Sequence, residues 1–144
     1  MTTPVNIVDG SSSGQKAHVT AIGQVVTAAY AYDETIFFEL AEDNTAYNFY
    51  GPKAGEQFVI TGIFAYADKQ VGTVTGATVI VYEGVSAATT TVAKTLFQME
   101  MAQVSNRDLA PLNILVNEGS YVNAQTDDDD IHMTITGYFI PEIS

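Results

Sequence analysis

Apolar and polar residues alternate in two long stretches of the chain, residues 57–67 and 131–140. A period of two predicts a β-strand with one face in the core and the other face in solvent. In the second stretch, the side predicted to be buried carries Ile131, Met133, Ile135, Gly137 and Phe139. In the first stretch, it carries Phe58, Ile60, Gly62, Phe64 and Tyr66. We therefore predict two long, half-buried strands.

The two predicted strands share a short motif, ITGIF at residues 60–64 and ITGYF at residues 135–139. Its glycine, Gly62 or Gly137, falls on the side predicted to be buried. There it either makes room for a bulky neighbour or marks a β-bulge. The recurrence is also compatible with chance, because such short combinations are common in β-proteins. We interpret the two copies as the middle strands of a β-sandwich.

Shorter stretches with strand character, separated by turn-forming residues, occupy much of the remaining chain. They lie at residues 35–40, 46–50, 77–82, 90–101, 112–116 and 121–124. Residues 90–101 could also form a helical stripe, but the alternation of Phe97, Met99 and Met101 with polar residues favours a strand. Residues 103–108 are predicted to form a loop. With the two long strands, the count is about eight, at the short intervals expected of a sandwich or barrel.

We predict an all-β fold, a two-sheet β-sandwich with the topology of a jelly-roll of about eight strands. In that topology the third and eighth strands are neighbours in one sheet, and these are the two strands that carry the shared motif. A length of 144 residues suits a single domain. The sequence has no cysteine, so neither a disulfide framework nor a structural zinc site is expected.

Residues 1–16 differ in composition from the rest of the chain. Five of them could pair as a short strand: Pro4, Val5, Asn6, Ile7 and Val8. A run rich in serine and glycine follows at residues 9–14, which is typical of a turn and flexible linker. We predict an extended N-terminal docking arm and linker at residues 1–16, and a β-sandwich domain at residues 17–144 that begins with alternation at residues 17–27. The alternative is that the arm folds back onto its own domain.

Acidic residues outnumber basic residues by 17 to 5, so the net charge is -12 at pH 7. Nucleic acid is not an expected partner, because phosphate contacts need clustered lysine and arginine. A membrane is not an expected partner either, since no basic patch for anionic lipid and no apolar run of ~20 residues occur. The net charge favours solubility. It is also compatible with an acidic outer surface on a particle that must not self-associate.

Four consecutive carboxylates form the sharpest charge feature: Asp127, Asp128, Asp129 and Asp130. Calcium is a hard ion that takes about six to eight oxygen ligands, so this loop is a candidate calcium site. The loop lacks the glycine and the spaced ligands of an EF-hand. We favour the alternative of a solvated loop whose charges protect a strand edge, and we expect no cofactor.

No catalytic motif is found in the sequence. Both histidines, His18 and His132, fall on outward faces of predicted strands, and neither a Gly-x-Ser-x-Gly motif nor a phosphate-binding loop occurs. We therefore expect that the protein is not an enzyme. The eight tyrosines are expected in the core or in subunit interfaces, where tyrosine is enriched. A carbohydrate-binding surface is the alternative, because exposed tyrosines can stack on sugars.

Two segments resemble a known class of proteins. VNIVDG at residues 5–10, the following Ser/Gly run and KAHVT at residues 16–20 look like the opening of small virion proteins of tailed bacteriophages. These include capsid decoration and head-fibre proteins. TITGYF at residues 134–139 is similar to the closing strand of several of them. The resemblance covers a minor part of the chain, and the lack of a fibre-like repeat disfavours a long tail fibre.

The resemblance implies a structural virion protein, made in the host bacterial cytoplasm and located on the exterior of the phage head. It implies a homo-oligomer, with a trimer favoured, whose N-terminal segment binds the major capsid protein or another virion protein. On this basis we expect a capsid decoration protein that reinforces the head. The alternatives are a receptor- or glycan-binding appendage of head or tail, an adaptor near the tail or portal, and a small enzyme with polar groups converging around His18 or His132.

Overall fold

The computed structural model describes residues 34–67, 77–102, 104–127 and 131–141. The chain divides between Ala31 and Tyr32 into two units, and every described residue belongs to the second unit. The predicted docking arm, the alternation predicted at residues 17–27 and His18 all lie outside the described residues.

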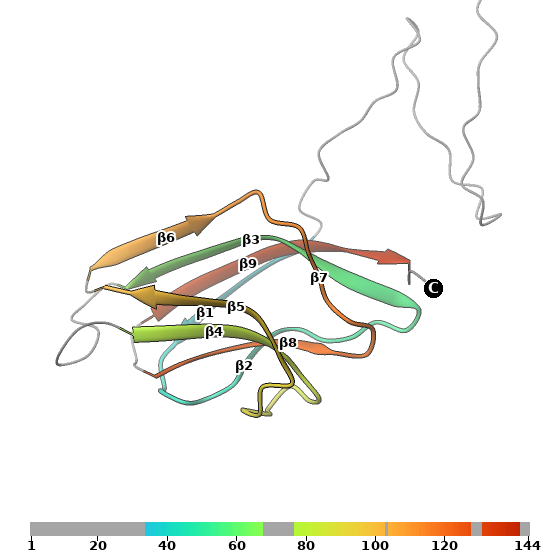
Figure 1. Ribbon diagram of the computed structural model, residues 1–144, viewed down its shortest axis with the longest axis horizontal. Helices are drawn as coiled ribbons and strands as arrows, with labels where there is room; N and C mark the ends of the chain where they lie inside the picture. Colours follow the sequence, from blue (N-terminus) through green and yellow to red (C-terminus); the bar gives the residue numbers. More distant parts are fainter. Residues whose placement is uncertain (1–33, 68–76, 103, 128–130, 142–144) are drawn as a thin grey trace, which may run out of the picture. The chain divides into compact units, whose positions relative to one another are not determined.

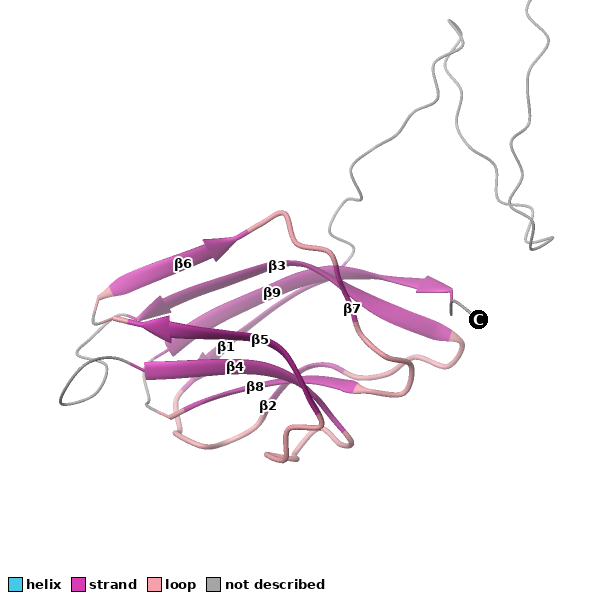
Figure 2. Cartoon of the chain, in the orientation of Figure 1, coloured by secondary structure: helices cyan, strands magenta, loops and turns pink. Residues whose placement is uncertain are grey.

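The described residues form nine β-strands and no helix. In chain order the strands are β1 (Glu34–Leu40), β2 (Tyr47–Tyr50), β3 (Glu56–Ala67), β4 (Ala77–Gly84), β5 (Lys94–Met101), β6 (Ser105–Leu109), β7 (Ile114–Leu115), β8 (Tyr121–Thr126) and β9 (Ile131–Pro141). They make two antiparallel sheets, as Figures 1 and 2 show. The first sheet has the order β1-β9-β3-β6, with β7 also paired to β3, and the second has the order β2-β8-β4-β5. The predicted all-β fold of two sheets is confirmed.

The two strands that share the motif, β3 and β9, pair with each other along nearly their whole lengths. Their antiparallel register runs from Glu56 opposite Pro141 to Ala67 opposite Ile131. Because β9 also pairs with β1, and β3 also pairs with β6 and β7, these strands occupy the middle of their sheet (Figure 1). The prediction that they are neighbours is confirmed.

The inner faces of the two sheets enclose one apolar core, to which both β3 and β9 contribute. In β9 the alternation places Ile131, Met133 and Ile135 in the core, each 0% exposed, as predicted. In β5, Met99 and Met101 are buried while their polar neighbours are exposed. That alternation confirms a strand over this stretch, although the strand begins at Lys94 and not at residue 90.

The second half of β3 does not follow the predicted alternation, because a β-bulge interrupts its register between Ile60 and Gly62. A bulge adds one residue to one strand, so side chains beyond it change face. The core-facing residues are Phe58 and Ile60 before the bulge, and Ile63, Ala65 and Ala67 after it. The prediction that Phe64 and Tyr66 face the core is therefore wrong, and Tyr66 is exposed.

The two motif glycines serve different purposes. Gly137 lies on the core side, where a Cβ atom would overlap the ring of Phe58 and the carbonyl oxygen of Val59. It makes room for a bulky neighbour. Gly62 lies at the bulge, where a Cβ atom would meet the hydroxyl of Thr136 at 2.8 Å. Since Thr136 points away from the core, the prediction that both glycines face the core is wrong for Gly62.

β6 is a strand where the sequence predicts a loop. Its side chains are mostly polar and exposed, and it lies at the edge of the first sheet, paired with residues 63–67 of β3. The sequence of β6 shows no apolar alternation, since the strand is held by backbone pairing with β3 and not by a buried side-chain face. The loop predicted at residues 103–108 is therefore incorrect. Polar side chains suit an edge strand, since they discourage pairing with another chain.

Candidate functional site

The outer face of the first sheet carries two aligned rows of side chains. The strand registers place Phe37, Thr134, Phe64 and Asp108 in one row across β1, β9, β3 and β6. The adjacent row consists of Glu39, His132, Tyr66 and Asn106. Because alternate residues of a strand share a face, both rows lie on the side of the sheet that points away from the core.

These rows border a depression of about 280 Å³. We call it the outer-face groove and define it by seven side chains, namely Phe37, Phe64, Tyr66, Asn106, Asp108, His132 and Thr134. The groove is built on four hydrogen-bonded strands, so its side chains stand on a rigid backbone. Rigid elements hold a binding constellation more accurately than loops do.

The aromatic side chains of the groove contact one another through His132. The ring of Phe37 stacks on the imidazole, with centroids 6.0 Å apart and planes at 14°. Tyr66 approaches the same imidazole from the neighbouring strand on the other side of β9, with centroids 6.2 Å apart. Phe37 is nevertheless 59% exposed and Tyr66 46% exposed. Clustered exposed rings of this kind mark a binding surface more often than scattered ones do.

The β6 side of the groove is polar and acidic. Asn106 Nδ2 donates a hydrogen bond to Asp108 Oδ2 at 3.4 Å, which is long and therefore weak. Both groups can exchange that bond for one with a ligand. Arg107 lies between them in the sequence but pairs with Ala65, so it points to the opposite side of the sheet. The groove therefore combines aromatic rings with a carboxylate.

Sequence reasoning placed His132 on an outward face, which is its position in the groove. It missed Tyr66 and Phe64, because uninterrupted alternation assigns both to the core. The signal that could have found them is Gly62, since a glycine inside a strand can mark a bulge. The buried tyrosines Tyr50 and Tyr82 fit the prediction of core tyrosines.

The candidate calcium loop is described only at its first residue. Asp127 Oδ1 accepts a hydrogen bond from the Thr78 N–H at 2.7 Å, and the Asp127 N–H donates to the Thr78 carbonyl at 3.2 Å. This carboxylate thus extends the pairing of β4 with β8. Asp128, Asp129 and Asp130 lie outside the described residues. In the described ranges, no group of three or more histidine, aspartate or glutamate side chains could hold a metal ion.

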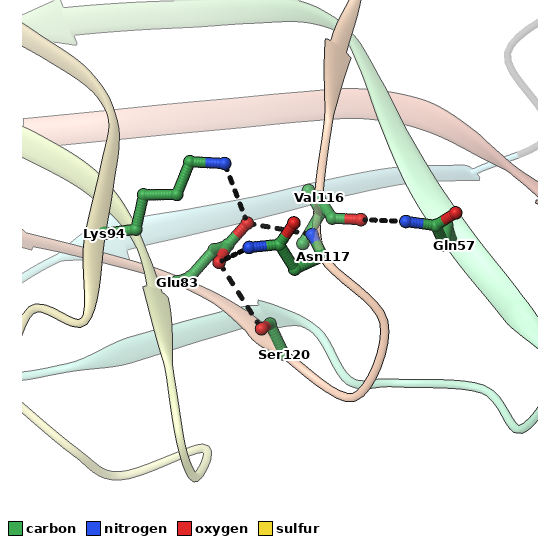
Figure 3. Close-up of polar contacts among 6 residues, drawn as sticks. All are labelled: Gln57, Glu83, Lys94, Val116, Asn117 and Ser120. Atoms are coloured by element: carbon green, nitrogen blue, oxygen red, sulfur yellow. Dashed lines mark hydrogen bonds and ion pairs between the residues drawn. The ribbon is translucent and has the colours of Figure 1, made fainter. Parts of the chain in front are cut away.

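A second polar cluster surrounds Glu83 of β4, which is 3% exposed. Its carboxylate accepts hydrogen bonds from the Asn117 N–H at 2.8 Å, Asn117 Nδ2 at 3.0 Å and Ser120 Oγ at 3.5 Å. Lys94 Nζ lies 3.6 Å away (Figure 3). Both carboxylate oxygens are thus occupied by groups of the β7–β8 loop and β5. The cluster fixes that loop to the second sheet and is a structural feature.

Comparison with known proteins does not assign this site. No protein-family model matches the chain, and no curated protein or solved structure matches it either. Among the described residues, no helix is long and apolar enough to cross a membrane. The functional argument therefore depends on the fold and on the chemistry of the outer-face groove.

Proposed function

We propose that the protein is a structural virion protein, a capsid decoration protein that binds the outer surface of a phage head and reinforces it. The observation that carries this proposal is the completeness of the sandwich formed by the described residues. Both of its sheets and its core are built from residues between Glu34 and Pro141. In the described parts of this range, every buried polar side-chain atom has a hydrogen-bond partner. A sandwich with a core of its own suits a protein that attaches through a separate segment.

The strand order supports a jelly-roll topology for this body. In the first sheet, β1 lies beside the last strand, which lies beside β3, and in the second sheet β2 lies beside β8. β6 and the short β7 pair with successive parts of one edge of β3, so together they fill a single strand position. Counted in this way, the body has the number of about eight that a jelly-roll requires. Jelly-rolls occur in viral capsids and in lectins, which is an analogy of fold and not of function.

The proposed mechanism is adhesion. The arm at residues 4–8 adds as a strand to an exposed sheet edge or groove of the major capsid protein. Apolar surface buried there stabilises the contact by ~25 cal/mol per Å² before the cost of ordering the arm. A homo-oligomer, with a trimer favoured, holds several capsid subunits at once and gains strength through multivalency. The net charge of -12 keeps decorated particles apart.

The test is to delete residues 1–14 and to count the copies retained on purified particles. We expect occupancy to fall to background while the thermal unfolding of the sandwich is unchanged. The matched control replaces Ser11, Ser12 and Ser13 by glycine, which keeps the arm and the linker length, and it should retain full occupancy. Unchanged occupancy after the deletion would reject the arm as the anchor. Failure of the full-length chain to bind purified heads would reject the decoration role itself.

A receptor- or glycan-binding appendage is the second candidate, and the exposed rings of the outer-face groove favour it. The two roles differ in copy number, because a decoration protein covers the head whereas an appendage or adaptor occupies a few positions. A low-resolution image of the particle distinguishes them. We do not propose catalysis around His132, since the groove is an open depression on a sheet face, and catalytic sites usually exclude water.

A further inference from the structure

We infer that the outer-face groove is a binding site for a neutral saccharide. A sugar ring has an apolar face of C–H groups and a rim of hydroxyls. A site for it therefore needs exposed aromatic rings and hydrogen-bonding side chains within reach of the same ligand. The first sheet presents both kinds of group around one depression. The inference is independent of the docking arm, and it rests on the second candidate function, which it deepens by naming the class of ligand.

The apolar part of the site is formed by Phe37 and Tyr66, which are 59% and 46% exposed. They flank His132, whose imidazole lies 6.0 Å from the first ring and 6.2 Å from the second, measured between centroids. These contacts orient the rings before a ligand arrives. Preorganised rings lose little side-chain entropy on binding, so more of the contact energy appears as affinity.

The polar part of the site comes from β6 and β9. Asp108 supplies a carboxylate that accepts hydrogen bonds, Asn106 supplies an amide that donates and accepts, and Thr134 supplies a hydroxyl that does both. A sugar has several adjacent hydroxyls that can pair with this mixed set. A few convergent polar groups of this kind fix the orientation of a ligand in a mostly apolar site.

The charge of the groove decides which class of ligand fits. Asp108 lines it, Glu39 stands in the adjacent row, and none of the described residues that line it is a lysine or an arginine. A phosphorylated, sulfated or carboxylated ligand would be repelled. A second copy of the chain is disfavoured too, because a two-fold contact through this face would bring carboxylates of the two copies together. A quaternary ammonium compound satisfies the charge but leaves the amide of Asn106 and the hydroxyl of Thr134 without a function.

The size of the groove limits the ligand. Its volume of about 280 Å³ lies just below the usual range of ~300–1,000 Å³ for ligand pockets. It therefore suits one or two sugar units, with any longer glycan extending into solvent. We expect a Kd of ~1 mM for a single site, which is a weak affinity. Many copies on one particle would raise the effective affinity by multivalency.

The test uses the full-length chain and a panel of neutral sugars, namely glucose, galactose, mannose, N-acetylglucosamine, lactose and maltose. Saturation-transfer NMR detects binding, and backbone amide shifts locate it. We expect at least one sugar to bind and to shift amides of β1, β3, β6 and β9 selectively. Phe37→Ala and Tyr66→Ala should each weaken binding roughly tenfold, because each removes one exposed ring. Asp108→Asn should weaken it about fivefold, since the carboxylate is the strongest acceptor.

The matched control is Val85→Ala, which truncates a side chain that is 80% exposed and lies after β4 of the other sheet. It should bind sugar as the unchanged protein does. Thermal unfolding of each variant shows whether the sandwich remains folded. Four results would overturn the inference: no binding of any sugar in the panel, binding by both ring variants as tight as that of the unchanged protein, selective binding of choline, or loss of an oligomer in Phe37→Ala. Intact sugar binding with no occupancy on particles would reject only the decoration role.

Discussion

The phenol of Tyr50 donates a hydrogen bond of 2.8 Å to the carbonyl oxygen of Ile135. Tyr50 lies on β2 of one sheet and Ile135 on β9 of the other, so this bond joins the two layers through the core. The Tyr50 ring also stacks on Phe58 of β3, with centroids 4.0 Å apart. One side chain therefore links β2 to both central strands of the opposite sheet.

Replacing Tyr50 by phenylalanine should lower the free energy of unfolding by about 1 kcal/mol. The substitution removes one buried hydrogen bond and retains the ring that stacks on Phe58. Urea unfolding measures the loss. Tyr66→Phe removes the same hydroxyl at an exposed position and should change stability little. If both variants lost the same free energy of unfolding, the hydrogen bond to Ile135 would contribute no more than an exposed hydroxyl does.

The stability of the protein should fall as the pH rises above about 10, the pKa of tyrosine in an unfolded chain. Burial raises the pKa of Tyr50 in the folded state, and the carboxylate of Glu34 raises it further. The unfolded chain then releases a proton that folded Tyr50 keeps, so the unfolded state gains stability with pH. Burial raises the pKa of Tyr82 as well. In thermal unfolding at increasing pH, Tyr50→Phe should show a shallower decline than the unchanged protein, and an identical decline would contradict this account.

Alanine should be tolerated far better at Gly62 than at Gly137. At Gly137 the new Cβ would overlap the backbone oxygen of Val59 and the ring of Phe58, and a carbonyl held in the sheet cannot move away. We expect a loss of about 3 kcal/mol or more there, at the upper end for overpacking. At Gly62 the nearest atoms belong to the side chains of Phe64 and Thr136, which can rotate, so about 1 kcal/mol is expected. Urea midpoints of the two variants in the reverse order would contradict the assignment of the bulge.

Removing the buried carboxylate of Glu83 should destabilise the protein by about 2 kcal/mol, because the hydrogen bonds that it accepts are lost. Glu83→Ala leaves the donors of Asn117 and Ser120 without their acceptor. Lys94→Met should cost less than about 1 kcal/mol, because the ammonium group is half exposed and an exposed ion pair contributes little. Chemical unfolding of the two variants makes the comparison. A larger effect for Lys94→Met would mean that the ion pair, and not the neutral donors, stabilises the loop.

Calcium should not change the melting temperature of the protein. Asp127 already uses one carboxylate oxygen to accept the N–H of Thr78, which suits a strand end. An ion that bound only the folded state would raise the melting temperature with its concentration. Thermal unfolding in a few millimolar calcium, compared with a chelator, tests this expectation. If added calcium raised the melting temperature and Asp127→Asn abolished that rise, the loop would be a calcium site after all.

The parts of the fold that could be predicted are those in which each strand obeys one simple period. β9 alternates without interruption, so its buried side chains Ile131, Met133 and Ile135 could be read from the sequence. The shared motif indicated its neighbour, and the adjacency of β3 and β9 is correct. An uninterrupted period and a repeated motif are local features, and a single sequence displays them fully.

The parts that could not be predicted depend on contacts distant in the sequence. β6 has no apolar period, because backbone bonds to β3 hold it at a polar edge. Glu83 stands next to a glycine and resembles a turn residue. It is nevertheless buried, and its carboxylate is paired with hydrogen-bond donors about 34 residues away along the chain. The outer-face groove joins four strands, and its composition follows only once their registers are known.

The β-bulge of β3 between Ile60 and Gly62 determines which side chains this molecule offers to its surroundings. Without the bulge, Thr61 would take a regular place in the pairing, and Phe64 and Tyr66 would turn into the space that Ala65 and Ala67 now fill. The solvent side would then carry alanines in place of rings. Deleting Thr61 would instead leave the rings outside, because Gly62 already lies opposite Thr136 and the residues after it keep their partners. A bulge thus lets a strand absorb an extra residue at one point while the surface beyond that point keeps its capacity for recognition.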